Sequence, residues 1–231
     1  MTIIADSLQA IQANIRQTRL MANRADEIKL LAVSKAQSAA RLREAYLAGQ
    51  RAFAENYVQE AIDKQEQLKD CAIEWHFIGP IQSNKTQLIA QHFDWVHSVD
   101  RLKIVGRLNE ARPRYLAPLN VCIQINSSAE DSKSGANLAE LSALASAINA
   151  LPRLKLRGLM AIPAPTKDLA KQRAQFKIVG DAFKALQRQG YKLDTLSIGM
   201  SDDYVAAIHE DATIVRIGSA IFGARPSKLQ N

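Results

Sequence analysis

Cysteine is nearly absent from this chain of 231 residues, which contains only Cys71 and Cys122. Two thiols cannot build a disulfide framework, and Cys122 lies inside an apolar run, where cysteine usually behaves as a small hydrophobic residue. The sequence also has no run of the roughly 18 apolar residues that a membrane span needs, and no secretory signal pattern at its start. We therefore expect a cytoplasmic protein without a membrane partner.

Aromatic residues make up only 6% of the chain, and the positive charge is not concentrated in any segment. Lysine and arginine outnumber aspartate and glutamate by 30 to 23, which gives a net charge of +7 and favours anionic ligands. Because no basic block and no base-stacking platform is evident, binding to nucleic acid or to a membrane surface is a secondary hypothesis. The four histidines show no spacing typical of a metal site, so we expect no metal.

Strand-like and helical patterns alternate along the whole chain. Several strand-like runs are almost continuously apolar, as in a parallel sheet that is covered on both faces. The expected strands cover residues 28–34, 51–54, 73–79, 95–99, 119–126, 155–161, 194–199 and 213–218. An amphipathic helical pattern precedes the first of them. This order predicts an α/β protein with a single domain over residues 1–231, a (β/α)8 TIM barrel with an extra N-terminal helix.

Distinctive polar residues follow the strands, at the end of such a barrel where ligand groups gather and where phosphate binds beside strands seven and eight. Lys35 follows the first strand, and Gly218 and Ser219 follow the last. A buried lysine loses its proton readily, and the neutral amine can form a Schiff base with an aldehyde. Gly218 lets the backbone approach an anion, and Ser219 completes a cup with its hydroxyl and amide. This pattern is what a covalently held pyridoxal phosphate (PLP) needs.

Other polar residues near the cup also have expected roles. Ser201 can cap the helix that follows strand seven, or it can meet the phosphate, and the two roles can coexist. Two carboxylates beside the cup would oppose an anion, so we expect Asp202 and Asp203 to point away. Arg216 would lie beneath the cofactor ring, where its guanidinium would keep the pyridine nitrogen unprotonated and weaken the ring as an electron sink. His76, on an apolar strand, is expected to be mainly a core histidine.

Six blocks of this sequence resemble the signature blocks of the pyridoxal phosphate homeostasis protein family, in order and over essentially the whole chain. They are residues 31–35, 55–60, 75–85, 158–160, 197–203 and 216–223. That family is similar to the barrel domain of alanine racemase and of fold type III decarboxylases. The resemblance implies a fold type III PLP-binding barrel, with Lys35 as the Schiff-base lysine. It also implies a role in vitamin B6 and amino-acid homeostasis without an established catalytic reaction, and hence no catalytic residues.

Carried over by position, the resemblance implies that Ser201, Gly218 and Ser219 hold the phosphate and that Arg216 faces the pyridine nitrogen. It further implies that Asn56 and Met160 line the ring pocket. Family members commonly have glycine where Ala54 stands and often threonine where Ser219 stands. A small residue and a hydroxyl are retained at these two positions, so the phosphate cup is little affected.

The resemblance leaves several alternatives. The chain could instead be a PLP-dependent amino-acid racemase or decarboxylase that uses Lys35 as its base, but this requires a second proton donor, and only Tyr57 could approach the mouth. PLP-dependent apoenzymes are possible partners, and Lys85 or Lys133 is a candidate for a transient second PLP site. We expect a monomer, because the β-rich second domain that dimerises the racemases is absent.

Overall fold

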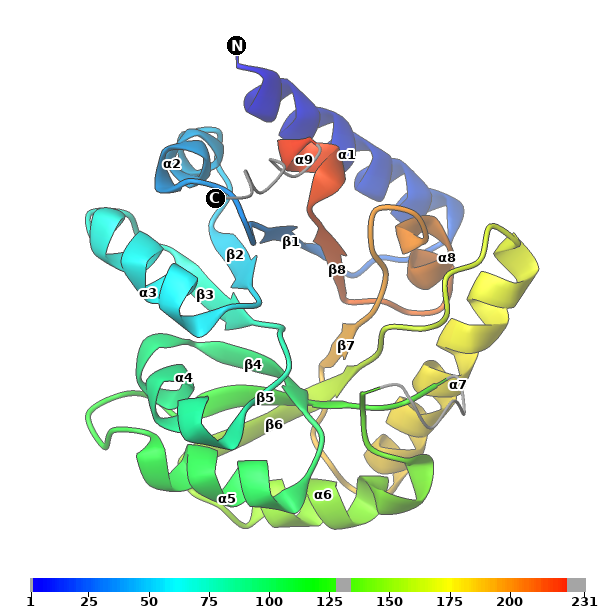
Figure 1. Ribbon diagram of the computed structural model, residues 1–231. Helices are drawn as coiled ribbons and strands as arrows, with labels where there is room; N and C mark the ends of the chain where they lie inside the picture. Colours follow the sequence, from blue (N-terminus) through cyan, green and yellow to red (C-terminus); the bar gives the residue numbers. More distant parts are fainter. Residues whose placement is uncertain (1, 128–133, 224–231) are drawn as a thin grey trace.

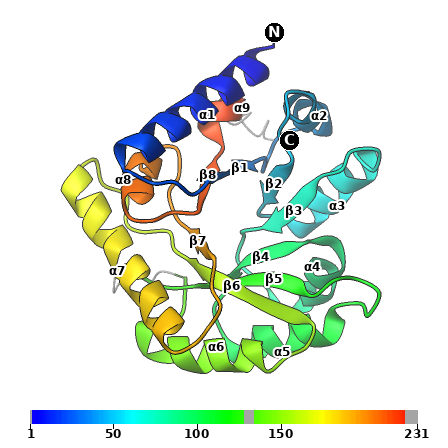
Figure 2. The same ribbon diagram turned by 180° about the vertical axis from the view of Figure 1, so that it is seen from behind.

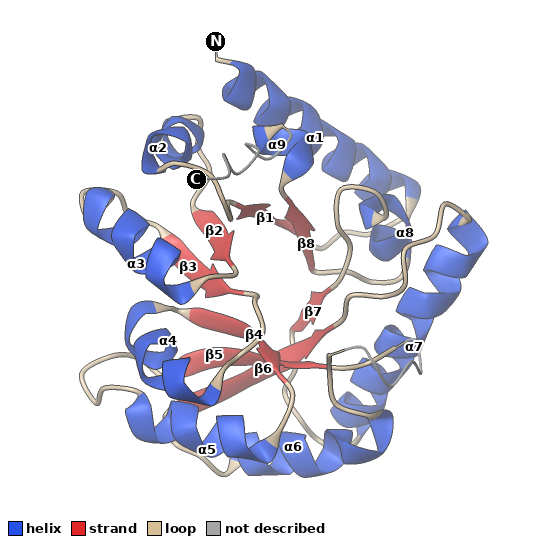
Figure 3. Ribbon diagram, viewed as in Figure 1, coloured by secondary structure: helices blue, strands red, loops and turns tan. Residues whose placement is uncertain are grey.

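The computed structural model describes residues 2–127 and 134–223, and the eight strands within them form a closed parallel barrel (Figures 1 and 3). The strands follow one another around the barrel in chain order, and the last pairs with the first. They are β1 (Lys29–Val33), β2 (Ala52–Glu55), β3 (Glu74–Phe77), β4 (Trp95–Val99), β5 (Leu119–Gln124), β6 (Leu154–Met160), β7 (Thr195–Ser197) and β8 (Ile214–Ile217). The predicted (β/α)8 barrel is therefore confirmed.

Helices form the outer layer of the molecule (Figure 3). They are α1 (Ile3–Met21), α2 (Ala39–Leu47), α3 (Val58–Gln67), α4 (Thr86–His92), α5 (Leu102–Ala111), α6 (Leu141–Asn149), α7 (Leu169–Arg188), α8 (Tyr204–His209) and α9 (Ser219–Phe222), with short 3-10 helices at Ser83–Lys85 and Leu138–Glu140. The extra N-terminal helix α1 packs beside α8 and α9, as both Figure 1 and Figure 2 show. None of the helices in the described ranges is long and apolar enough to cross a membrane.

The ends of the strands lie within two residues of their predicted positions. The seventh strand is the shortest, and it stops at Ser197 instead of continuing to Gly199. Gly199 has a φ of +91°, which turns the chain out of the sheet, and a Cβ there would lie 2.6 Å from the Cβ of Ala207. The turn therefore needs glycine for both its backbone conformation and its contact with α8.

The main core lies between the barrel and the surrounding helices, where the buried face of α1 contributes Ile4, Leu8, Ile11 and Ile15. Inside the barrel the packing is different, because apolar clusters and buried polar residues share the space. Two small apolar clusters fill part of this space: Leu31, Ala52, Ala54 and Ile214 form one, and Trp95, Cys122 and Met160 form the other. His76, His97, Ser197 and Arg216 are the buried polar residues that share this interior. These polar residues are hydrogen-bonded to one another and include Arg216, which belongs to the site described next.

Candidate functional site

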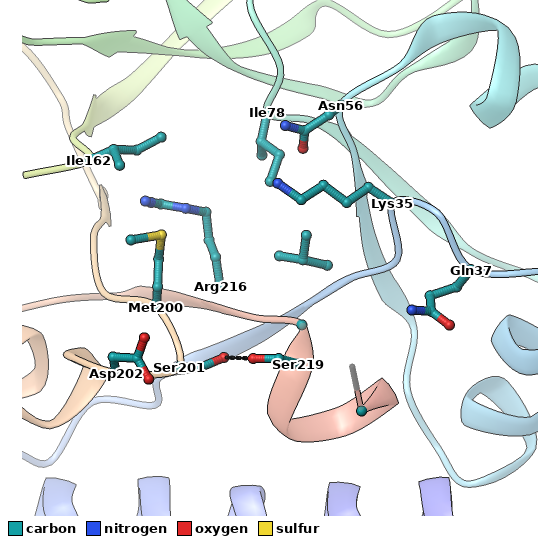
Figure 4. Close-up of a pocket in the computed structure, with 13 residues that line it drawn as sticks. Lys35, Gln37, Asn56, Ile78, Ile162, Met200, Ser201, Asp202, Arg216 and Ser219 are labelled. Carbon is teal, nitrogen blue, oxygen red and sulfur yellow. Dashed lines mark hydrogen bonds between the residues drawn. The ribbon is translucent and has the colours of Figure 1, made fainter. Parts of the chain in front are cut away.

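A pocket opens where the segments that follow the strands meet at the carboxyl end of the barrel (Figure 4). It has a volume of about 260 Å³. Its lining consists of Val33, Lys35, Gln37, Asn56, Ile78, Ile162, Met200, Ser201, Asp202, Arg216, Gly218, Ser219 and Gly223. Of the seven residues that the sequence suggests for the site, the pocket brings together Lys35, Asn56, Ser201, Arg216, Gly218 and Ser219, and it leaves out Met160.

Lys35 lies in the tight turn that follows β1. The backbone N–H of Gln37 donates to the carbonyl of Ser34 across 3.0 Å, which makes Lys35 and Ala36 the two central residues of the turn. Ala36 has a φ of +60°, a value that favours glycine at the third position of such a turn. From this turn the side chain of Lys35 extends into the pocket, toward Asn56 (Figure 4). The turn thus aims an amine at the space that the other lining residues enclose.

Two serine hydroxyls meet on the opposite side of the pocket. Ser219 Oγ donates to Ser201 Oγ across 3.2 Å, which joins the segment after β7 to the segment after β8 (Figure 4). Beside them Gly218 packs closely on β1, since a Cβ added there would lie 3.1 Å from the carbonyl oxygen of Val33. The hydroxyls and the bare backbone of Gly218 together form a small polar cup.

Arg216 forms the floor of the pocket and is held rigidly by uncharged acceptors. Its Nη1 donates to the hydroxyl of Ser197 across 2.9 Å and also to the carbonyl of that residue. Its Nη2 donates to the carbonyl of Ala161 across 3.0 Å. Burial lowers the pKa of Arg216 to about 10, so the guanidinium keeps its charge at neutral pH. A fixed positive donor with no hydrogen-bonded carboxylate among the described residues is therefore available to a ligand above it.

A chain of hydrogen bonds leads from Arg216 through the barrel interior. Ser197 Oγ lies 2.8 Å from Nδ1 of His97, and His97 Nε2 lies 2.9 Å from Nδ1 of His76. If His76 carries its proton on Nε2 and directs it at Glu74, then His97 donates to His76 and the Ser197 hydroxyl donates to His97. The remaining ring nitrogen of His76 faces Glu74 Oε1 at 3.6 Å. Burial lowers the pKa of both histidines, which favours the neutral form of each ring.

Asn56 contributes an unsatisfied acceptor to the pocket. Among the residues that the structure describes, nothing donates to its buried Oδ1. The backbone of Asn56 is held from behind by Gly79, because a Cβ on Gly79 would lie 2.2 Å from the Asn56 carbonyl oxygen. A buried acceptor without a donor is unfavourable by roughly 1–3 kcal/mol unless a ligand supplies one. The orphan oxygen therefore fits a pocket that is completed by a bound molecule.

Met160 does not line the pocket, and this differs from the expectation that it contacts the ring. It is the last residue of β6, and its fully buried side chain packs with Trp95 and Cys122 in the barrel interior. Ile162, two residues further on, reaches the pocket instead. Alternate residues of a strand point to the same face, so Met160 is directed inward like Ile162 but lies one step deeper.

The predicted helix-capping role of Ser201 is wrong. The residue before α8 is Asp203, whose Oδ1 accepts a hydrogen bond of 2.6 Å from the N–H of Met200, while Ser201 pairs with Ser219. The expectation for the two carboxylates holds for only one of them. Asp203 is absent from the pocket lining, but Asp202 is part of it (Figure 4). The carboxylate of Asp203 is bound within the turn by the N–H of Met200, whereas Asp202 lies at the rim of the pocket.

Other candidate residues lie away from the pocket lining. Tyr57 is 62% exposed, and Lys85 ends a short 3-10 helix. His76 is fully buried and stacks on Trp95, as expected for a core histidine. Lys133 lies outside the described residues. Within residues 2–127 and 134–223, no group of three His, Cys, Asp or Glu side chains could hold a metal ion.

Sequence reasoning missed several residues of the site. Gln37 and Met200 line the pocket beside residues that were predicted, and both lie within two positions of them. Ser197, which supports Arg216, and His97, which contacts Ser197, carry a different signal, since each is a polar residue in a short strand that is buried along its whole length. Such residues in a barrel interior need a polar partner, and the pairing itself is not visible in the sequence.

The site therefore lies in a closed parallel barrel, with an amine after the first strand and two hydroxyls after the last two, and comparison with known proteins assigns this barrel to a family. Residues 7–226 match the family model of the alanine racemase N-terminal domain. The solved structure of PipY from Synechococcus elongatus PCC7942, described as having PLP bound, matches with a TM-score of 0.84. The identity is 36%, and the match covers 95% of this chain and 100% of that one.

Two curated relatives match over nearly their full lengths. The protein of Pseudomonas aeruginosa named pyridoxal phosphate homeostasis protein is 56% identical over 226 residues, which cover 97% of this chain and 97% of that protein. The Escherichia coli protein of the same name is 52% identical over 229 residues, with a coverage of 97% and 98%. This chain belongs to the pyridoxal phosphate homeostasis protein family, as its sequence blocks indicated.

Proposed function

We propose that this protein binds PLP and holds it as a Schiff base on Lys35, and that it thereby serves PLP and amino-acid homeostasis in the cytoplasm. The observation that carries this proposal is the convergence of Lys35, Arg216, Ser201 and Ser219 on one pocket from separate segments of the chain. An amine, a fixed guanidinium and a hydroxyl cup match the aldehyde, the ring nitrogen and the phosphate of PLP. The PLP-bound PipY structure supports the choice of ligand.

Each of the seven residues that the sequence suggests for the site has a proposed part. The neutral amine of Lys35 adds to the aldehyde carbon of PLP, a C=N bond forms, and the carbonyl oxygen leaves as water. Ser201, Gly218 and Ser219 hold the phosphate, and Arg216 faces the pyridine nitrogen. Asn56 gains a donor for its orphan oxygen. Met160 supports the pocket from below, since it lies deeper in the barrel.

We propose further that the protein carries PLP without turning over a substrate. PLP acts as an electron sink most strongly when its ring nitrogen is protonated, and Arg216 cannot provide that proton because a guanidinium keeps its own. Among the described lining residues, the ionisable side chains are Lys35, Asp202 and Arg216. A racemase or decarboxylase would therefore depend on Asp202 as its second acid, and this one residue is the observation that keeps such an activity as the alternative.

The proposal also covers the oligomeric state of the protein and the proteins that receive PLP from it. We propose that one domain over residues 1–231 works as a monomer and passes PLP to PLP-dependent apoenzymes. Cys71 and Cys122 are both free thiols, as suits a reducing compartment. Neither a nucleic acid nor a membrane is part of this proposal.

The decisive experiment is to incubate the purified protein with PLP, reduce it with borohydride and map the modified peptide. The adduct should lie on Lys35, and it should be absent in Lys35→Ala but unchanged in the control Lys177→Ala, which removes an exposed lysine of α7 outside the pocket lining. A reduced adduct that is spread over surface lysines, or none at all, would overturn the proposal. Solvent deuterium incorporated at the α carbon of amino acids and lost in Asp202→Asn would favour the enzymatic alternative instead.

A further inference from the structure

A buried ion cluster lies directly behind the turn that carries Lys35. Lys64 of α3 has only 5% of its side chain exposed, and Glu55 of β2 has none. The Nζ of Lys64 donates to Glu55 Oε1 across 2.7 Å, to Glu60 Oε1 across 2.6 Å and to the carbonyl of Ser34 across 2.8 Å. An ammonium has three protons to donate, and here all three are used. None of the three charged residues lines the pocket.

The same cluster holds the backbone on both sides of Lys35. The carbonyl of Ser34, which belongs to the peptide group before Lys35, accepts from Lys64. The N–H of Ala36, which belongs to the peptide group after it, donates to Glu60 Oε1 across 2.6 Å. One ion pair, Lys64 with Glu60, therefore fixes both peptide groups that flank the Cα of Lys35. The hydroxyl of Ser34 adds a hydrogen bond of 2.6 Å to Glu55.

The turn needs this support because its backbone is strained. Ala36 has a φ of +60°, in the left-handed region that a residue with a Cβ rarely adopts. Such a conformation persists only where the surroundings hold it. Glu60 binds the N–H of this very residue, so the cluster stabilises the conformation that directs Lys35 into the pocket.

We propose that Lys64 and Glu60 are positioning residues, which clamp the Lys35 turn and thereby set the rate at which Lys35 captures an aldehyde in the pocket. This inference rests on the proposed function. The clamp acts through the backbone of Lys35 and makes no contact with the bound molecule. Its loss therefore misdirects the amine while the cup of Ser201 and Ser219 and the floor at Arg216 remain in place.

Glu60 offers the cleaner test, because its side chain is 30% exposed and its removal leaves no empty space in the core. Glu60→Ala removes the acceptor of the Ala36 N–H, whereas Glu60→Gln retains a carbonyl oxygen that can accept it. Glu66→Ala is the matched control, since Glu66 also lies on α3 and forms an exposed ion pair, with Lys69. Lys64 is tested in the double variant Lys64→Met with Glu55→Gln, which removes the buried cation and a carboxylate partner together.

Two ligands separate positioning from a general effect on the pocket. PLP reports capture by Lys35, measured as the rate of the absorbance change on mixing. Pyridoxine 5'-phosphate has an alcohol in place of the aldehyde, so its affinity reports the cup and the ring site alone. We expect Glu60→Ala and the double variant to slow PLP capture by about 10- to 100-fold, as for a misplaced reacting group, with an unchanged affinity for pyridoxine 5'-phosphate. Glu60→Gln should restore most of the rate, and Glu66→Ala should match the parent.

Equal losses with both ligands would show that the cluster only maintains the fold, and an unchanged rate in Glu60→Ala would show that the turn needs no clamp. Either result overturns this inference while the proposed function stands. A parent protein that forms no adduct on Lys35 would instead remove the proposed function and this inference with it.

Discussion

The hydroxyl of Ser219 donates to the hydroxyl of Ser201 across 3.2 Å, and this bond ties the loop between β7 and α8 to the start of α9. Each hydroxyl can rotate, so both can turn a proton toward an anionic ligand in the pocket. Phosphate commonly binds beside strands seven and eight of such barrels. The serine pair, whose two members follow different strands, therefore supports the proposal that these hydroxyls bind the phosphate.

Removal of either hydroxyl should weaken phosphate binding. A hydrogen bond to a charged group contributes about 1.5–3 kcal/mol, so Ser201→Ala and Ser219→Ala should each reduce the affinity for pyridoxine 5'-phosphate by at least roughly 10-fold. The losses should not add in the double variant, because the two side chains bond to each other. Ligand titration measures this, and Ser142→Ala on α6 is the control. Equal losses for pyridoxine, which lacks the phosphate, would contradict a phosphate site.

A methyl group at Gly218 should be harmful, although the backbone there is not left-handed. The added Cβ would lie 3.1 Å from the carbonyl oxygen of Val33, so β1 and β8 must separate slightly. We expect Gly218→Ala to lower the free energy of unfolding by about 1–3 kcal/mol, as overpacked sites do. Gly106→Ala is the counterpart, because open space surrounds Gly106 inside α5, and it should raise stability by about 0.5–1 kcal/mol. Urea denaturation of both variants tests the pair, and a Gly218→Ala protein as stable as the parent would refute the close approach.

Much of the fold could be predicted because the strands are recognisable from short segments of sequence, mostly apolar runs between turn signals. The positions of Lys35 and Ser219 followed from the barrel rule that residues after strands face one mouth. Depth within the barrel did not follow from the strand pattern, so the sequence could not show that Met160 lies below the residues that line the pocket. The support of Arg216 by Ser197 and His97 also escaped prediction, because these hydrogen bonds join residues that are far apart in the sequence.

Arg216 should not be replaceable by lysine. The planar guanidinium bridges Ser197 and the carbonyl of Ala161 with separate nitrogens, and a single ammonium cannot reach both in the same geometry. We expect Arg216→Lys to lose about 1–3 kcal/mol of unfolding free energy, the usual effect of a buried acceptor left without its donor. Chemical denaturation measures the loss, and bound PLP should restore part of it if the ligand still occupies the pocket. An unchanged unfolding midpoint would mean that the bridge contributes nothing to stability.

The neutral histidine pair predicts how stability depends on pH. Burial holds the pKa of His97 well below its ordinary value and also lowers that of His76, whereas both titrate near 6.5 in the unfolded chain. Below about pH 6.5 the histidines are therefore protonated in the unfolded chain but remain neutral in the folded chain. Their contribution to the free energy of unfolding is fully present above that pH and is lost as the pH falls.

Each histidine can contribute a slope of up to about 1.4 kcal/mol per pH unit in this window. His97→Gln keeps a donor and an acceptor for its neighbours but cannot be protonated. It should therefore flatten the dependence of unfolding free energy on pH between about 5 and 6.5 by up to that amount. Urea unfolding at several pH values measures the slope, with His92→Gln at an exposed position as the matched control. If His97→Gln retains the full slope of the parent, His97 must accept its proton inside the folded barrel, and the one-directional chain from Arg216 to His76 cannot exist in that form.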